Sequence, residues 1–391
     1  MARMVLNETS YFGAGCRKEV VAELNKRDMK KAFIVSDGDL VKFGVVKMVT
    51  DVLDGAGVTY TIFSDVKANP TIANVKAAMK AFNDYAPDVI IAIGGGSCID
   101  TAKAVGVIAT NPSFADVKSL EGTANTKNKA FPTICFATTS GTAAEVTINY
   151  VITDEEAGRK LVCVDPNDIP MIAFNDAEMM MSMPKGLTAS TGMDALTHAI
   201  EGYITPGANP ISDLLCWNSI KFIAENLRAA VADGNNAAAR EGMAYGSYVA
   251  GMAFSNVGLG IVHSMAHPLG ARFDVPHGVA NALLLPYVME YNKCAALKKY
   301  GDIARAMGVD IKGMSEEQAA DAAIAAVKKL AEDVNIPKTI KELKNRATGE
   351  VLIKESDLEQ LSKDAFIDPC TGGNPRKTSV EEILEIYKTA Y

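Results

Sequence analysis

The sequence predicts an α/β N-terminal domain with a mostly parallel sheet, followed by an all-α C-terminal helical domain. Up to about residue 180, short β-branched and apolar runs alternate with amphipathic segments of helix length, a pattern typical of βαβ units. From about Lys185 the strand signals fade, and long segments bearing Ala, Leu, Met and Glu indicate helices. A chain of 391 residues is long enough for two such domains. We therefore expect one domain over residues 1–184 and a second over residues 185–391.

Strands and helices are expected to alternate through the first half. The strand segments are apolar and β-branched, whereas the helical segments carry apolar residues three and four positions apart. The expected strands are residues 31–36, 59–63, 88–93 and 133–137, with further strands at 160–164 and 171–174. The expected helices are residues 40–53, 71–85 and 97–109.

Composition and charge argue against several classes of protein. A formal net charge of −8 argues against nucleic acid as a partner, because phosphate binding relies on clustered Lys and Arg. No apolar run approaches the roughly 18–20 residues that span a bilayer, and the N-terminal residues are too polar for a signal peptide. The seven cysteines include no C-x-x-C pair, which disfavours a disulfide framework or a cysteine zinc site. We expect a cytoplasmic protein with neither a nucleic-acid nor a membrane partner.

A glycine-rich turn follows the expected strand at 88–93. It reads Gly94-Gly95-Gly96-Ser97 and runs directly into an expected helix. Backbone N–H groups at such a helix N-terminus, together with the helix dipole, favour a bound pyrophosphate. The G-x-G-x-x-G spacing is absent because Ile99 stands where the third glycine would be. A plain tight turn is the alternative.

Two further segments are consistent with a bound dinucleotide. Thr138-Thr139-Ser140-Gly141-Thr142 follows the strand at 133–137 and offers four hydroxyls for phosphate or ribose oxygens, or else a capping turn. Asp37 follows the first strong strand, where a carboxylate binds ribose hydroxyls and repels a 2′-phosphate. That position favours NAD over NADP, although an ordinary turn aspartate is the alternative.

The chain has only four histidines, and all lie within about 80 positions. Asp194 and His198 are four residues apart in an expected helix that opens near Thr188 or Ser190, so they share one face. His263 and His267 have the same spacing, and His277 follows ten residues later.

This set suits a divalent transition metal such as Fe, Zn, Co or Ni. No Glu stands between His263 and His267, so the zinc-peptidase signature H-E-x-x-H is absent. Pro268 is expected to kink or end the turn that carries these two histidines. The alternative, that the four are unrelated surface or core histidines, fits their clustering poorly.

These motifs resemble those of the iron-dependent (group III) alcohol dehydrogenases, and the resemblance covers essentially the whole chain. The motifs that carry it are Gly94-Gly95-Gly96-Ser97 with Asp100 and Lys103, the segment 138–147, the segment 192–198, the segment 263–270 and the segment 276–281. The resemblance implies an α/β dinucleotide-binding domain, an all-helical domain and a metal in the cleft between them, a dehydroquinate synthase-like architecture. It also implies a homodimer in which the N-terminal strand is exchanged.

The resemblance also implies roles for particular residues. The metal ligands would be Asp194, His198, His263 and His277. His267 would then serve as a catalytic proton relay. The NAD-binding positions would be Asp37, Asn69, Gly95, Gly96, Ser97, Thr138, Thr139, Thr142, Val151 and Lys160. The substrate pocket would be lined by Asn149, Phe254 and Cys370, as in the lactaldehyde-reducing members of the family.

The expected activity is reversible, NAD(H)-linked reduction of a short aldehyde with one divalent metal, Fe²⁺ or else Zn²⁺. Reduction of (S)-lactaldehyde to (S)-1,2-propanediol is the leading expectation. The alternatives are a 1,3-propanediol, butanol or glycerol dehydrogenase of the same family, or a cyclising lyase resembling 3-dehydroquinate synthase. The lyase would need a basic phosphate pocket, and residues 188–286 hold only four Lys and Arg side chains. A protein that merely stores metal or nucleotide is disfavoured, since storage gives no reason to combine both motifs.

Overall fold

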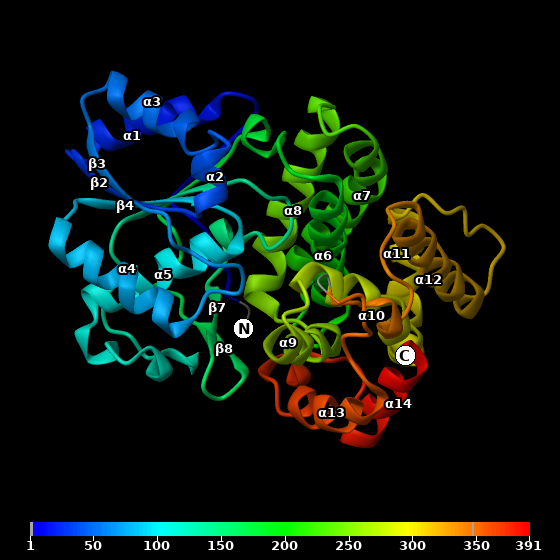
Figure 1. Ribbon diagram of the computed structural model, residues 1–391. Coiled ribbons are helices and arrows are strands. Elements are labelled where there is room, and N and C mark those ends of the chain that lie inside the picture. The colour runs from blue at the N-terminus through cyan, green and yellow to red at the C-terminus, as the bar shows by residue number, and fades with distance from the viewer. Residues whose placement is uncertain (1–2, 346–347) are drawn as a thin grey trace. The chain divides into compact units, whose positions relative to one another are not determined.

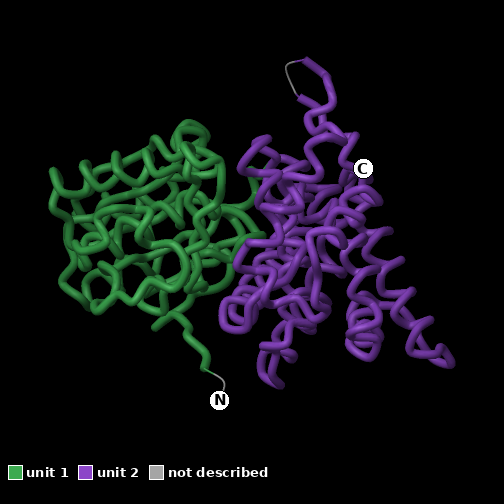
Figure 2. The backbone as a smooth tube through the Cα atoms, turned by 90° about the horizontal axis from the view of Figure 1, so that it is seen from below, with its two compact units in different colours: residues 1, 3–183 green, residues 2, 184–391 purple. Residues whose placement is uncertain are grey.

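The structure is a computed structural model that describes residues 3–345 and 348–391. It divides into two compact units, which Figure 2 colours separately: unit 1 comprises residues 3–183 and unit 2 residues 184–391. The α/β and all-helical architectures expected from the sequence are confirmed in unit 1 and unit 2, respectively.

Unit 1 is built on a six-stranded sheet in the order β1-β9-β6-β4-β2-β3 (Figure 1). Every neighbouring pair of strands is parallel, as the βαβ pattern predicts. The strands are β1 (Thr9–Phe12), β2 (Lys31–Val35), β3 (Thr59–Phe63), β4 (Val89–Gly94), β6 (Thr133–Ala137) and β9 (Ile172–Asn175). The sequence pattern did not reveal β1, which lies at one edge of the sheet.

Helices cover both faces of this sheet, so its central strands are apolar on both sides. In β2 and β4, Ile34 and Ile91 pack with α1 and α3, whereas the adjacent Phe33 and Ile90 pack with α4 and α5. The helices of unit 1 are α1 (Val20–Lys26), α2 (Gly38–Lys42), α3 (Lys47–Gly55), α4 (Ile72–Tyr85) and α5 (Gly96–Thr110). Figure 1 shows α1 and α3 on one side of the sheet and α4 and α5 on the other.

The expectation of a single helix over residues 40–53 is wrong. The segment forms α2 and α3 with a break between them. Gly44 lies in that break with φ of +80°, a left-handed conformation that cannot continue a right-handed helix.

A second, three-stranded sheet in the order β5-β8-β7 was not foreseen. Its strands are β5 (Gly122–Thr123), β7 (Asn149–Asp154) and β8 (Arg159–Val164). The expected strand at 160–164 is therefore present as β8, but it pairs antiparallel with β7 outside the main sheet.

Unit 2 is helical over its described residues, apart from an isolated bridge between Lys344 and Val351. Its helices are α6 (Lys185–Ile204), α7 (Pro210–Ala232), α8 (Ala237–Val257), α9 (Ile261–Phe273), α10 (His277–Asn292), α11 (Leu297–Ala306), α12 (Glu316–Asp333), α13 (Leu358–Phe366) and α14 (Val380–Ala390). Short 3₁₀ turns connect several of them, including η9 (Pro369–Gly373).

Two details of unit 2 differ from the sequence expectation. Helix α6 begins at Lys185, one turn before Thr188, with Pro184 as its N-cap. Helix α9 does not end at Pro268 but runs on to Phe273, since a proline removes only one N–H donor and the helix is packed on both sides of it. Among the described residues no single helix is long and apolar enough to cross a membrane. Helices α8 and α9 together are long and apolar enough, but they are bent by 102° relative to each other.

Candidate metal centre and nucleotide-binding segments

One face of helix α6 carries three chemically important side chains. Asp194, His198 and Glu201 follow one another at spacings of four and three residues, so they align along that face. All three are at least 96% buried. The spacing of the first two was recognised in the sequence, whereas Glu201 was not assigned a role.

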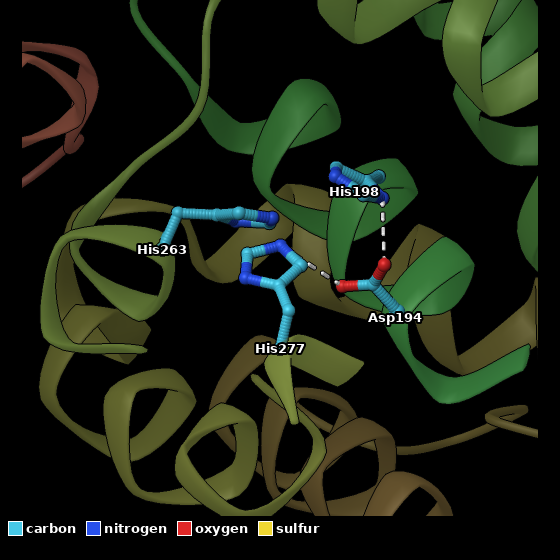
Figure 3. Close-up of side chains that lie close together, drawn as sticks. All are labelled: Asp194, His198, His263 and His277. Carbon is cyan, nitrogen blue, oxygen red and sulfur yellow. Dashed lines mark ion pairs between the residues drawn. The ribbon is translucent and has the colours of Figure 1, made fainter. Parts of the chain in front are cut away.

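Two other helices bring His263 and His277 to this face of α6 (Figure 3). His263 lies in the first turn of α9, and His277 is the first residue of α10. Each of the four residues offers one ligand atom, and these four atoms all lie within 4.8 Å of one another. Oδ1 of Asp194 lies 3.6 Å from Nε2 of His277, and its Oδ2 lies 4.0 Å from Nδ1 of His198. The four residues expected as ligands thus form one cluster.

The donor set fits a divalent transition metal. Three imidazoles and one carboxylate are ligands that Fe²⁺ and Zn²⁺ accept, and the four donor atoms gather within 4.8 Å of one another. Burial first, and then the neighbouring imidazoles, lower the pKa of His263 well below its usual value. The ring is therefore neutral at physiological pH, as a metal ligand must be.

Asn281 is a neighbour of this cluster that sequence reasoning missed. Its Nδ2 atom lies 2.7 Å from Oδ1 of Asp194, 3.1 Å from Nε2 of His263 and 3.0 Å from Nε2 of His277. It stands one helical turn after His277 on α10, so an i to i+4 search from the histidine could have found it. Its amide orients the ring of His277 and the carboxylate of Asp194.

His267 lies beside the cluster rather than in it. Its ring is stacked at 5.6 Å from that of His277, and its Nδ1 atom lies 2.7 Å from Oδ2 of Asp368. Oδ1 of Asp368 accepts a hydrogen bond from the backbone N–H of Cys370. Burial alone would raise the pKa of Asp368, but His267 and these hydrogen bonds outweigh it and lower that pKa. Sequence reasoning missed Asp368.

The three residues expected to line a substrate pocket are divided between the units. Phe254 on α8 stacks on the His198 ring at a centroid distance of 4.1 Å, so it borders the metal cluster. Cys370 in η9 shares a possible ligand group with His267 and Asp368. Asn149 begins strand β7 in unit 1. The structure therefore places two of the three beside the histidines.

In unit 1, the expected nucleotide-binding segments follow the carboxyl ends of three adjacent parallel strands. Asp37 follows β2, the glycine turn follows β4 and the threonine segment follows β6. Ligands of open α/β sheets bind at this edge. The side chain of Asp37 also caps α2 by accepting the N–H of Leu40 at 2.8 Å.

The glycine turn and the threonine segment pack directly on each other. A Cβ atom added to Gly95 would lie 3.0 Å from the side chain of Thr139, and one added to Gly96 would lie 2.9 Å from that of Thr142. Any larger residue would push the two segments apart. Helix α5 starts at Gly96, and its N-cap Gly95 has no side chain to bond the first N–H groups of the helix. Phosphate binding by these N–H groups stays a prediction. Ser97 lies in this first turn, and Thr138 forms the base of the threonine segment with its N–H on the carbonyl of Gly94.

Of the remaining expected NAD positions, Val151 and Lys160 lie on the second sheet and Asn69 lies in the loop before α4. Nζ of Lys160 donates to Oδ1 of Asn69 at 2.8 Å, which joins two positions 91 residues apart. The N–H of Val151 donates to Oδ2 of Asp100 on α5 at 3.0 Å. Nζ of Lys103, one turn later on α5, donates to the carbonyl of Asn149 at 2.9 Å. Strand β7 is thus tied to the helix that begins at the glycine turn.

Comparisons with known proteins agree with this geometry. The family model for iron-containing alcohol dehydrogenase matches residues 7–177, and the model for the C-terminal part of the Fe-containing alcohol dehydrogenase family matches residues 188–391. Lactaldehyde reductase of Escherichia coli K12 is 53% identical over 389 residues, covering 100% of this chain and 99% of that protein. 1,3-Propanediol dehydrogenase of Klebsiella pneumoniae is 41% identical over 98% of this chain and 97% of its own length.

Solved structures show the same fold along the full chain. A 1,3-propanediol oxidoreductase and an alcohol dehydrogenase from Oenococcus oeni each superpose with a TM-score of 0.95 and 40% identity, covering 100% of both chains. Matches of this extent cover both the dinucleotide-binding motifs of unit 1 and the histidine cluster of unit 2. The chain therefore belongs to the iron-containing alcohol dehydrogenase family, whose members are oxidoreductases that use NAD(H) and Fe²⁺.

Proposed function

We propose that this protein reduces (S)-lactaldehyde to (S)-1,2-propanediol with NADH, reversibly, and that short aldehydes in general are its substrate class. The 53% identity to a lactaldehyde reductase along the whole chain supports this substrate. The observation that carries the proposal is the buried cluster of one carboxylate and three imidazoles in unit 2. In a dehydrogenase, such a set serves to hold a metal that activates a carbonyl or hydroxyl group.

Asp194, His198, His263 and His277 are the proposed ligands of Fe²⁺, with Zn²⁺ as the alternative metal. When bound, the metal supplies Lewis-acid stabilisation of the negative charge that develops on the substrate oxygen, and NADH supplies the hydride. Phe254 packs on His198 and excludes water from that side of the cluster. Cys370 and Asn149 are proposed to contact the substrate.

His267 is the proposed proton relay. Asp368 accepts the hydrogen bond from its Nδ1, which leaves Nε2 as the ring nitrogen that exchanges a proton. The product alkoxide needs one proton for each aldehyde reduced. A ring held by a buried carboxylate has its orientation fixed for that transfer.

The proposed NAD-binding residues lie at the carboxyl edge of the six-stranded sheet, on the second sheet and, for Asn69, in the loop before α4. The turn at Gly95, Gly96 and Ser97 would bind the pyrophosphate, and Asp37 would bind a ribose. Thr138, Thr139, Thr142, Val151, Asn69 and Lys160 complete the proposed set.

The decisive experiment measures NADH oxidation with lactaldehyde, glycolaldehyde and 3-hydroxypropionaldehyde on anaerobically purified, iron-loaded protein. We expect the highest kcat/KM with lactaldehyde. Asp194→Ala should lose bound metal and activity together, because it removes the only carboxylate among the four ligands. Full activity of a metal-free Asp194→Ala protein would refute the proposed metal centre, and absence of turnover with every aldehyde would refute the proposed activity.

The second candidate activity is the interconversion of 3-hydroxypropionaldehyde and 1,3-propanediol. It is favoured by the 41% identity to a 1,3-propanediol dehydrogenase and by the TM-score of 0.95 to a 1,3-propanediol oxidoreductase. A higher kcat/KM with 3-hydroxypropionaldehyde than with lactaldehyde in the same assay would select it.

Assembly and location are also proposals. Strand β1 lies at the edge of the six-stranded sheet, so its outer side is available for the proposed homodimer with exchanged N-terminal strands. All seven cysteines are free thiols, which is consistent with the cytoplasm. Sedimentation of the protein at several concentrations tests the dimer.

A further inference from the structure

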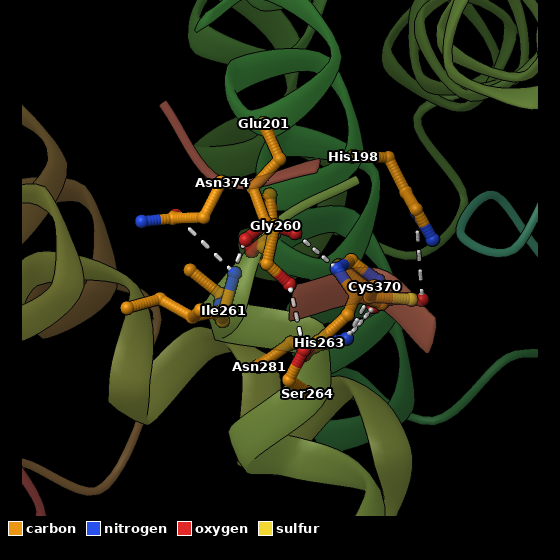
Figure 4. Close-up of polar contacts among 12 residues, drawn as sticks. His198, Glu201, Gly260, Ile261, His263, Ser264, Asn281, Cys370 and Asn374 are labelled. Carbon is orange, nitrogen blue, oxygen red and sulfur yellow. Dashed lines mark hydrogen bonds and ion pairs between the residues drawn. The ribbon is translucent and has the colours of Figure 1, made fainter. Parts of the chain in front are cut away.

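We infer that Glu201 is a positioning residue of the metal centre: its buried carboxylate holds His263 in the tautomer and orientation that coordinates metal through Nε2. The inference rests on the proposed metal centre and extends it to a residue outside the four ligands. Figure 4 shows Glu201 beside Gly260 at the start of α9, with a dashed line from its carboxylate to His263.

The first observation is the contact itself. Oε2 of Glu201 lies 2.5 Å from Nδ1 of His263, and both side chains are 2% exposed. On its other side, Nε2 of His263 faces the cluster, 3.1 Å from Nδ2 of Asn281. The hydrogen-bond pattern therefore assigns a proton to Nδ1 and a lone pair to Nε2. A carboxylate on the far nitrogen of a metal-bound histidine fixes the ring and raises its basicity.

The second observation is that, among the described residues, the groups that hydrogen-bond to the Glu201 carboxylate are N–H donors. Oε1 accepts the N–H of Val262 at 2.7 Å, and the N–H groups of Gly260 and His263 also interact with the carboxylate. Gly260 is the N-cap of α9 and has no side chain to cap the helix, so Glu201 supplies that cap from α6. A glutamine at 201 would turn an NH₂ group toward one of these N–H donors.

The surroundings leave no room for Glu201 to move. A Cβ atom added to Gly260 would lie 2.9 Å from Oε1 of Glu201, so the backbone of α9 approaches the carboxylate closely. Asn374 holds the same turn from another direction, with its Oδ1 atom 3.4 Å from the N–H of Ile261. The position of His263 is thus set by a carboxylate that is itself locked in place.

The charge of the centre gives Glu201 a second role. Asp194 provides one negative charge among the four ligands, and the Glu201 carboxylate provides another one imidazole away. Together they balance the two positive charges of a divalent ion within a buried site.

The test compares Co²⁺ affinity, measured by chelator competition on metal-stripped protein, for wild type, Glu201→Gln and Glu145→Gln. Glu145 is the matched control because it is equally buried but lies in unit 1. We expect Glu201→Gln to weaken Co²⁺ binding about 10- to 100-fold and to shift the visible absorption bands of bound Co²⁺. Glu145→Gln should bind Co²⁺ as wild type does.

An affinity for Co²⁺ within twofold of wild type in Glu201→Gln, with only a lower melting temperature of the metal-free protein, would overturn the inference and leave Glu201 as a helix cap. The Asp194→Ala variant distinguishes failure of the Glu201 inference from failure of the proposed metal centre. If wild type and Asp194→Ala bind Co²⁺ equally weakly, the proposed centre itself is wrong.

A second measurement on the wild type covers the case in which Glu201→Gln does not fold. With only four histidines, ¹⁵N-histidine spectra of the Zn²⁺-loaded protein can be assigned by substitution. We expect His263 to carry a proton on Nδ1, strongly shifted downfield by the carboxylate. A His263 without a proton on Nδ1 would overturn the inference.

Discussion

The Nδ1 atom of His267 lies 2.7 Å from the Oδ2 atom of Asp368, although the two residues are 101 positions apart in the chain. Helix α9 supplies the histidine, and Asp368 is the N-cap of the turn η9. Both oxygens of Asp368 accept hydrogen bonds, one from His267 and one from the N–H of Cys370. Asp368 therefore fixes the orientation of the His267 ring.

Replacing Asp368 should therefore lower turnover while leaving the metal in place. We expect Asp368→Ala to reduce kcat about 10- to 100-fold, within the usual contribution of a positioned acid–base group, with an unchanged metal content. Asp364→Asn is the control, because Asp364 pairs with Arg272 in a partly exposed ion pair. Equal losses in both variants, or loss of metal from Asp368→Ala, would contradict the relay.

Replacing Asp37 should change the preference between the two nicotinamide cofactors. Asp37→Ser removes the negative charge but can still cap α2, so we expect kcat/KM with NADPH to rise about 10-fold because charge repulsion is relieved. Asp37→Ala should show the same rise in kcat/KM with NADPH. Because it also removes the cap of α2, it should lower the free energy of unfolding by about 1 kcal/mol. Steady-state kinetics with both cofactors and urea unfolding check this. No gain with NADPH in either variant would argue against ribose binding by Asp37.

Removing the Lys103 ammonium group should destabilise unit 1. Its Nζ donates to Oγ1 of Thr147 at 3.0 Å and to the carbonyl of Asn149. It also lies 4.0 Å from the buried Asp168, whose oxygens have no hydrogen-bond partner among the described residues. We expect Lys103→Met to lower the free energy of unfolding by about 3–5 kcal/mol, because the carbonyls of Thr147 and Asn149 lose their buried donor. Lys76→Met, at an exposed position, should change it by less than about 0.5 kcal/mol in the same urea titration.

The buried carboxyl of Glu145 should make stability fall as pH rises. Burial raises its pKa from the usual 4.5 to about 7, so between these values the folded protein binds more protons than the unfolded chain. Its contribution to stability is then full below about pH 4.5 and is lost as pH rises through 7, by a few kcal/mol at most, at about 1.4 kcal/mol per pKa unit. Glu145→Gln should flatten the change of the urea midpoint between pH 5 and 7.5. An identical pH profile in both proteins would contradict the burial effect.

The sequence revealed those parts of the fold and site that depend on local spacing. Strands β2, β4 and β6 are short apolar runs that burial on both faces requires, so composition alone identifies them. Edge strand β3 was found from its aromatic and β-branched residues. The pair Asp194 and His198 shares a helix face because four residues make about one turn. Strands β1 and β7 have a weaker signal because each lies at the edge of its sheet, where a continuous apolar run is not needed.

What the sequence by itself determined is the two-part architecture, the strand–glycine–helix unit and the residue types that bind metal, because each depends on neighbours within one helical turn or one strand. Only the tertiary structure decided that His263 and His277 meet α6, that Glu201 lies behind His263 and that Asp368 lies behind His267. These contacts join residues from about 60 to more than 100 positions apart, and their geometry is set by how helices pack, which no local pattern encodes.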